Sequence, residues 1–149
     1  IIAYDINLFR DDKSLRFDIR YNRTANGIGG GSDAIMFREM LKREVKMMYQ
    51  PEMSIDHFVE PWRMKRIYFW KLHFIAGRKF GQFETPEYNK TIFGIPPFMF
   101  VHAGKHFFRT LTQFILFNNQ YVRQGMNFSH ALGQIYGRYL RYKDNSKKS

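Results

Sequence analysis

Cysteine is absent from this 149-residue sequence. Without a thiolate the chain forms no disulfide, no cysteine-ligated zinc or iron–sulfur site and no cysteine nucleophile. The sequence also lacks any run of about 18 uncharged apolar residues, so it predicts no ordinary transmembrane helix. No catalytic signature is found, and Glu52, Asp56 and Glu60 are expected to form a solvated patch rather than an acid–base pair. We therefore expect no enzyme activity.

Acidic residues are scarce relative to basic ones. The chain has 13 Asp and Glu against 24 Lys and Arg, which gives a formal net charge of +11 at pH 7. This excess predicts anionic neighbours, namely phosphate backbones, anionic lipids or acidic proteins. The length fits a single domain over residues 1–149. A cleaved organelle transit peptide would explain why the sequence begins at Ile1, and so would a disordered leading segment; both explanations stay open.

The first 26 residues have an alternating pattern of apolar and polar side chains. Residues 2–9 and 14–22 alternate in this way, and they flank the polar stretch 10–13. This pattern is typical of a β-hairpin with one apolar face. We predict an α+β fold, mostly α, in which a hairpin arm occupies residues 1–26. The hairpin face expected to dock on a partner protein consists of Leu15, Phe17, Ile19 and Tyr21.

A glycine-rich segment follows the predicted hairpin at residues 27–32. Its place between a strand and a helix suits a phosphate-binding loop. The glycine spacing, however, matches neither G-x-G-x-x-G nor G-x-x-x-x-G-K-[ST], and no βαβ unit surrounds it. We predict a flexible hinge here rather than a phosphate site.

Helical periodicity dominates residues 33–143, the predicted helical body. Gly77 and Gly125 stand where helices are expected to end. We predict three to four helices after the hinge, over residues 33–49, 61–76, 97–124 and 129–143. The longest is 97–124, and a polar tail follows at 144–149.

Aromatic residues are abundant, with 16 Phe and 9 Tyr, and they are interleaved with cations, most densely at 63–80 and 98–117. This mixture suits a membrane interface, where Trp and Tyr sit at headgroup level and Lys and Arg reach phosphates. It also suits RNA, whose bases stack on rings. The predicted contacts to lipid or phosphate are Trp62, Arg63, Arg66, Trp70, Lys71, Arg78 and Lys79.

The segment 98–117 favours the membrane over RNA, because most of its phenylalanine rings would not reach a base. A helix beside a bilayer, packed on other subunits, needs such rings. Lys105 and Arg109 would then face protein, a headgroup or water. We predict that Phe107, Phe114 and Phe117 pack against neighbouring subunits.

Two histidines, His102 and His106, stand four residues apart on one face of the longest predicted helix. This spacing suits a zinc or haem ligand pair. Lys105 and Arg109 flank the pair and would repel a metal ion, and the sequence offers no nearby acidic ligand. We predict packing residues here, with no metal and no cofactor.

These features together favour a non-catalytic accessory subunit of a large mitochondrial inner-membrane assembly, a respiratory-chain complex or ATP synthase. Its expected partners are other protein subunits and anionic phospholipid. One alternative is a structural RNA-binding protein of the mitochondrial ribosome. A second is a small soluble metal- or haem-binding protein that uses His102 and His106.

Overall fold

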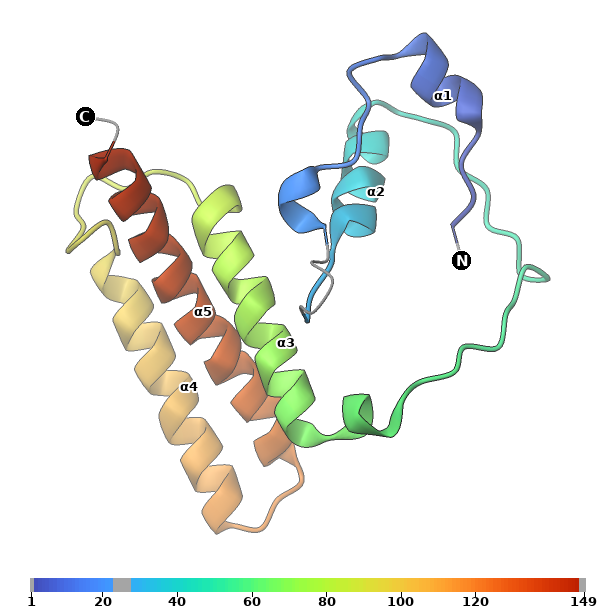
Figure 1. Ribbon diagram of the computed structural model, residues 1–149. Coiled ribbons are helices and arrows are strands. Elements are labelled where there is room, and N and C mark those ends of the chain that lie inside the picture. Colours follow the sequence, from blue (N-terminus) through green and yellow to red (C-terminus); the bar gives the residue numbers. More distant parts are fainter. Residues whose placement is uncertain (1, 23–27, 148–149) are drawn as a thin grey trace. The chain divides into compact units, whose positions relative to one another are not determined.

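A computed structural model describes residues 2–22 and 28–147, and within these ranges the chain is helical with no β-strand (Figure 1). The chain divides into two compact units, residues 1–59 and 60–149. Each unit is described by itself, and the single domain expected over 1–149 stays a prediction.

The predicted N-terminal hairpin, and with it the α+β class, is wrong. Residues 2–9 contribute to a short helix, α1 (Ile6–Asp11), and residues 14–22 contain the 3-10 turn η1 (Ile19–Tyr21). Aspartates cause the difference, because their side chains bond to nearby backbone and compete with strand formation. Asp5 accepts a hydrogen bond from the Asn7 amide at 2.9 Å, and Asp18 does so from the Arg20 amide at 3.0 Å.

The first unit is built on a small core between its N-terminal segment and α2 (Ser32–Lys42). Three side chains are buried there, and partly buried apolar residues surround them. The core comprises Leu15, Met36 and Met40, with Tyr4, Leu8, Phe9 and Val45 packed against it. Such a core is small for a segment of this length, since the rest of the unit stays largely exposed.

Helix α2 ends at Lys42, well before the predicted residue 49. The chain leaves the helix through Glu44, whose φ is +53°. The Val45 amide then donates to the Met40 carbonyl at 3.0 Å, which is the pattern of a Schellman motif. Val45 thereby reaches the core of the unit, and this contact outweighs the helical periodicity that continues in the sequence.

The predicted hinge is only partly described, because residues 23–27 lie outside the described ranges. Gly29, Gly30 and Gly31 have φ values of +131°, +151° and +108°. Backbone in this region favours glycine over any residue with a Cβ. Helix α2 starts directly after Gly31, and the flexible hinge stays a prediction.

The second unit packs three helices side by side, α3 (Arg66–Lys79), α4 (Pro97–Ile115) and α5 (Gln120–Ser146). A 3-10 turn, η2 (Pro61–Met64), precedes α3, and a π-helical turn, η3 (Phe80–Glu84), extends it. In Figure 1 the carboxyl-terminal α5 lies between α3 and α4 and touches both.

The predicted helix over 97–124 is interrupted, so its predicted length is wrong. A last helix is present over 129–143 as predicted, but it starts earlier, at Gln120. The chain turns at Phe117, whose φ is +49°. The Asn118 amide donates to the Gln113 carbonyl at 3.0 Å, which closes the end of α4. The Asn118 side chain then accepts from the Gln120 amide at 2.9 Å and starts α5. The longest helix is consequently α5, with 27 residues.

Glycines let α3 and α5 approach each other at backbone distance. A Cβ added to Gly77 would lie 2.9 Å from the His130 carbonyl carbon, and one added to Gly133 would lie 2.8 Å from the Arg78 nitrogen. Gly81 and Gly137 repeat this arrangement one turn further along, with distances of 2.9 and 2.8 Å. We call these four residues the glycine seam. It explains why Gly77 does not end its helix, contrary to prediction.

Candidate docking surface on helix α4

Helix α4 begins at Pro97, where the sequence predicts a helix start. Its inner side packs into the unit through the buried residues Met99 and Ala103. The opposite side carries an apolar stripe that runs the full length of the helix. We call this stripe the outer face; it consists of Phe100, Val101, Gly104, Phe107, Phe108, Leu111, Phe114 and Ile115. The positions repeat at three and four residues, which places them on one side of a helix.

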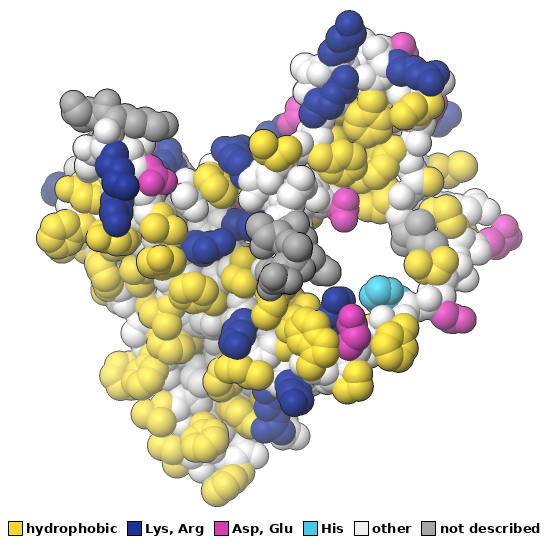
Figure 2. Space-filling model, viewed as in Figure 1, with side chains coloured by type: hydrophobic (Ala, Val, Ile, Leu, Met, Phe, Trp, Pro, Cys, Tyr) yellow, Lys and Arg dark blue, Asp and Glu magenta, His cyan; other side chains and the backbone are white. Residues whose placement is uncertain are grey.

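The large side chains of the outer face are exposed to solvent. The exposed fraction is 73% for Val101, 65% for Phe108 and 60% for Phe114. Figure 2 shows hydrophobic side chains gathered over this helix. Contiguous apolar surface of this kind is uncommon on a monomer, which makes the outer face the candidate docking surface.

Positive charge borders the outer face and negative charge is missing from it. The 19 residues of α4 include no Asp or Glu. Lys105 and Arg109 lie along one edge of the stripe, and both are exposed. In the described part of the chain neither side chain forms an ion pair. The surface is therefore an apolar band with a cationic border.

The two histidines of α4 contact each other on the side of the helix turned away from the stripe. The Nε2 atoms of His102 and His106 lie 3.2 Å apart. Burial lowers the pKa of His106, and the neighbouring His102 lowers it further. Within the described ranges no group of three or more metal-ligating side chains occurs. The pair is thus accounted for by a hydrogen bond between the two rings.

A further histidine pair lies close by, between α3 and α5. The ring centroids of His73 and His130 are 6.4 Å apart. Burial lowers the pKa of His130, with smaller contributions in the same direction from His73, His102 and His106. Positive charge on these neighbouring rings therefore disfavours a proton on His130.

Four of the predicted lipid or phosphate contacts reach the surface at the start of α3. Trp62 is 47% exposed, and the Arg63 guanidinium lies 5.1 Å from its ring centroid. Arg63 also pairs with Glu60 at 2.8 Å, and Arg66 donates to the Tyr121 hydroxyl. Lys71 is exposed as well. This surface remains a candidate for anionic contacts.

The other three predicted contacts turn into the helix packing. Trp70 is half-buried, and its indole nitrogen donates to the Val122 carbonyl at 3.3 Å. A Cβ on Gly125 would lie 2.8 Å from the Trp70 ring, so the ring fills the space beside that glycine. Lys79 is only 8% exposed, and Arg78 is half-buried. The structure therefore separates these three from the surface group.

The predicted docking residues also fall into two groups. Leu15 and Tyr21 are buried within the first unit, whereas Phe17 and Ile19 are exposed. On the second unit the predicted residues Phe107, Phe114 and Phe117 are all exposed, at 44%, 60% and 96%. The last of these stands at the turn that ends α4, next to the outer face.

Apolar side chains are exposed in a second place that the sequence pattern did not single out. Residues 46–59 have no regular helix or strand, and several large side chains there face solvent. The exposed fraction is 85% for Met48, 86% for Tyr49 and 80% for Phe58. No periodicity marks this segment, so only the structure reveals its exposure.

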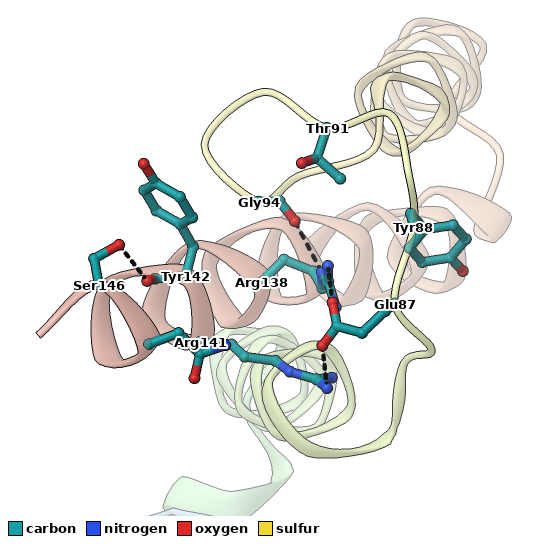
Figure 3. Close-up of a pocket in the computed structure, with 9 residues that line it drawn as sticks. Glu87, Tyr88, Thr91, Gly94, Arg138, Arg141, Tyr142 and Ser146 are labelled. Carbon is teal, nitrogen blue, oxygen red and sulfur yellow. Dashed lines mark hydrogen bonds and ion pairs between the residues drawn. The ribbon is translucent and has the colours of Figure 1, made fainter. Parts of the chain in front are cut away.

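A pocket of about 320 Å³ lies between α5 and the loop before α4 (Figure 3). Arg138 is 3% exposed and donates to the Gly94 carbonyl at 2.9 Å and the Pro86 carbonyl at 3.2 Å. Figure 3 shows Glu87 between Arg138 and Arg141, paired with both. These cations already have protein partners, so the pocket anchors the loop and is not a candidate for anion binding.

No helix in the described residues has the length and apolar character needed to cross a bilayer. Comparisons with protein-family models, with curated proteins and with solved structures found no match to this chain. The candidate site is accordingly defined by its own residues: the apolar outer face of α4 and its cationic edge.

Proposed function

We propose that this chain is a non-catalytic structural subunit of a large assembly at the mitochondrial inner membrane, where it stabilises neighbouring subunits. The observation that carries the proposal is the outer face of α4, an exposed apolar stripe along the whole helix. The docking surface lies on a helix that is itself packed against α5. A surface held in this way is suited to binding other chains rather than to chemistry.

The energetics of the outer face support a buried location in the working assembly. Fully burying one phenylalanine or leucine side chain contributes about 1.5–3 kcal/mol. The face exposes several such side chains within one helix, including Phe108, Leu111 and Phe114. Covering these side chains with a neighbouring subunit would favour association, against the translational and rotational entropy that association costs.

The charges of the chain support a location beside anionic headgroups. Each Lys or Arg near an anionic bilayer surface contributes about 1 kcal/mol of attraction. Lys65, which precedes α3, and Lys71 on α3 are exposed cations of this kind. The net charge of +11 acts in the same direction.

The RNA-binding alternative would use Trp62, Arg63 and Arg66, which present rings beside cations. Both of these cations already have partners within the chain: Arg63 pairs with Glu60, and Arg66 donates to the Tyr121 hydroxyl. RNA binding would also leave the outer face of α4 uncovered. The membrane assembly is therefore the proposal that uses more of the exposed surface.

Fractionation of the native source tests the proposal. Membrane, ribosomal and soluble fractions are separated at moderate salt, the membranes are solubilised in mild detergent, and the chain is located by mass spectrometry. We expect it to migrate with a large complex of mitochondrial inner membranes. Sedimentation with RNA-rich particles that is lost after nuclease treatment would contradict the proposal and support the RNA alternative.

A variant pair sharpens the test. Phe108→Glu places a charge in the centre of the outer face and should release the chain from the complex. Asn89→Glu adds the same charge at an exposed position of the loop before α4 and should leave the chain bound. Equal retention of both variants would show that the outer face is not the attachment surface.

A further inference from the structure

One glycine of the second unit differs from the rest, and it lies in the middle of the outer face. A Cβ built on Gly77, Gly81, Gly125, Gly133 or Gly137 would meet other atoms of this chain within 3.0 Å. A Cβ built on Gly104 meets nothing within 4 Å. The described part of the second unit therefore gives no steric reason for glycine at position 104.

Glycine in a helix interior has an energetic disadvantage. It destabilises a helix by about 0.5–1 kcal/mol relative to alanine. Five helical glycines in this unit are accounted for by the close approach of another segment. The same explanation applied to Gly104 requires an approaching backbone that does not belong to the second unit's own helices.

Four large apolar side chains surround Gly104 on the surface of the helix. Phe100 and Val101 lie one turn before it, and Phe107 and Phe108 lie one turn after it. All four are exposed, at 45%, 73%, 44% and 65%. Four side chains around one position form the hole that receives a residue of a facing helix.

We propose that a helix of a partner protein crosses α4 at Gly104, with an apolar side toward the outer face and carboxylates toward Lys105 and Arg109. This inference rests on the proposed function and specifies its docking contact. The partner helix inserts a residue between the phenylalanines, and its backbone approaches Gly104 as α3 and α5 approach each other at the glycine seam.

The charges on α4 favour a partner helix over a second copy of the chain at this site. A two-fold crossing of α4 on α4 at Gly104 would bring Lys105 close to its own counterpart. Like charges at such a contact are destabilising, and α4 has no acidic residue to compensate them. A partner helix with Asp or Glu at its edge satisfies both exposed cations.

The presence of glycine at position 104 favours a partner helix over lipid at this site. Acyl chains adapt to a helix surface and need no glycine for close approach, so a lipid-facing position 104 would accommodate any apolar residue. A facing helix needs a small residue where the backbones approach each other. Replacing Gly104 by leucine should therefore disrupt a contact with a facing helix and leave a contact with lipid intact, which makes the inference testable.

The experiment compares incorporation of full-length tagged variants into the native membrane complex, measured by native electrophoresis and quantitative mass spectrometry. Gly104→Leu should reduce incorporation at least tenfold. Ala76→Leu, which adds apolar volume at an exposed position of α3, is the matched control and should retain wild-type incorporation. The thermal unfolding of each purified variant, followed by circular dichroism, verifies that both are folded.

Charge variants and cross-linking identify the occupant. Lys105→Glu should lower incorporation at least fivefold, and Lys105→Arg should preserve it. A zero-length carbodiimide reagent, which joins amines to carboxylates, should link Lys105 to an Asp or Glu of another protein in the purified complex. A link to a second copy of this chain, or photolabelling of position 104 by a lipid probe in place of a protein link, would overturn the inference.

The outcomes also distinguish this inference from the proposed function. If the wild-type chain is absent from every membrane complex, the proposed function fails. If the wild-type chain is present and a folded Gly104→Leu variant is incorporated equally well, only the helix crossing at Gly104 is refuted.

Discussion

The glycine seam between α3 and α5 and the outer face of α4 place the same residue type in opposite surroundings. In the seam, glycines allow backbone groups of two helices to lie so close that a Cβ would clash at 2.8–2.9 Å. On the outer face, Gly104 has open space in front of it. The first is a completed interface and the second has the form of one whose other half is missing.

This difference shows what the second unit contributes by itself. Helices α3 and α5 are fixed by backbone contact, which leaves few alternative packings. Helix α4 packs on α5 with Met99 and Ala103 and presents its aromatic side outward. The unit is thus a rigid support for one exposed helix face, and substitutions can separate the support from the face.

The largest expected effect is on the seam. Gly133→Ala should destabilise the second unit by about 3 kcal/mol or more, at the upper end of overpacking costs, because the atoms that clash are backbone and cannot change rotamer. The new Cβ would lie 2.8 Å from the Arg78 nitrogen and 3.0 Å from the Phe74 carbonyl carbon. Urea denaturation followed by circular dichroism measures the change. An unfolding free energy within 0.5 kcal/mol of wild type, on the order of surface substitutions, would contradict the close approach of the helices.

The second effect concerns Arg138, which holds the loop before α4 against α5. Arg138→Met should cost about 2–3 kcal/mol, because the carbonyls of Gly94 and Pro86 lose their charged donor. Lys143→Met, at an exposed position of the same helix, is the control and should stay within about 0.5 kcal/mol of wild type. Equal stability of the two variants would exclude Arg138 as the anchor of this loop.

The seam shows why part of the fold could not be predicted from the sequence. Gly77 and Gly125 have the usual appearance of helix-ending residues. Their actual role depends on His130 and Trp70, which are distant in sequence and near in space. Local pattern cannot distinguish a glycine that ends a helix from one that admits a neighbouring backbone. The helices were therefore placed in the right regions with wrong ends.

The N-terminal error has a different cause. Alternation over residues 14–22 is real, but Asp12 accepts hydrogen bonds from the amide and hydroxyl of Ser14 at 2.8 and 2.6 Å. Asp18 makes the equivalent contact with Arg20. These local bonds favour turns over strands. Weighing the aspartates against the alternation would have weakened the hairpin prediction.

The candidate site was easier to anticipate than the fold. The aromatic density of 98–117 singled out Phe107, Phe114 and Phe117, and the structure leaves all three exposed; their docking role stays a prediction. The sequence does not single out Gly104, because this glycine differs from the other helical glycines only in having open space where they contact another segment. Only coordinates reveal that kind of difference.

The third effect is a dependence of stability on pH, which arises at His106 of α4 and His130 of α5 and not on the outer face. The pKa of His106 and that of His130 lie below their ordinary value in the folded chain, chiefly because of burial. The unfolded chain therefore binds more protons once the pH falls to about 6.5, the ordinary value for histidine. Stability should be greatest above that pH and should decline as the pH falls through and below it.

Denaturation at pH 7.5 and pH 5.5 tests this dependence. The double variant His106→Gln with His130→Gln should show a smaller loss between the two pH values than wild type does. His57→Gln, in the exposed segment of the other unit, is the control and should keep the wild-type loss. Stability that increases on acidification in the wild-type chain would contradict the assignment to these two histidines.

The smallest effect has the opposite sign and distinguishes the outer face from the seam most clearly. Gly104→Ala should stabilise the isolated chain by about 0.5–1 kcal/mol, because alanine is the better helix former and nothing lies within 4 Å of the new methyl group. The same substitution at Gly133 destabilises, although both positions are helical. Urea denaturation of the two variants under one set of conditions measures the contrast. A loss of stability at Gly104 would mean that an unseen neighbour within this chain already occupies the space. A gain in stability would establish that glycine at position 104 lowers the stability of the isolated chain. The reason for having glycine there would then lie in what the outer face contacts.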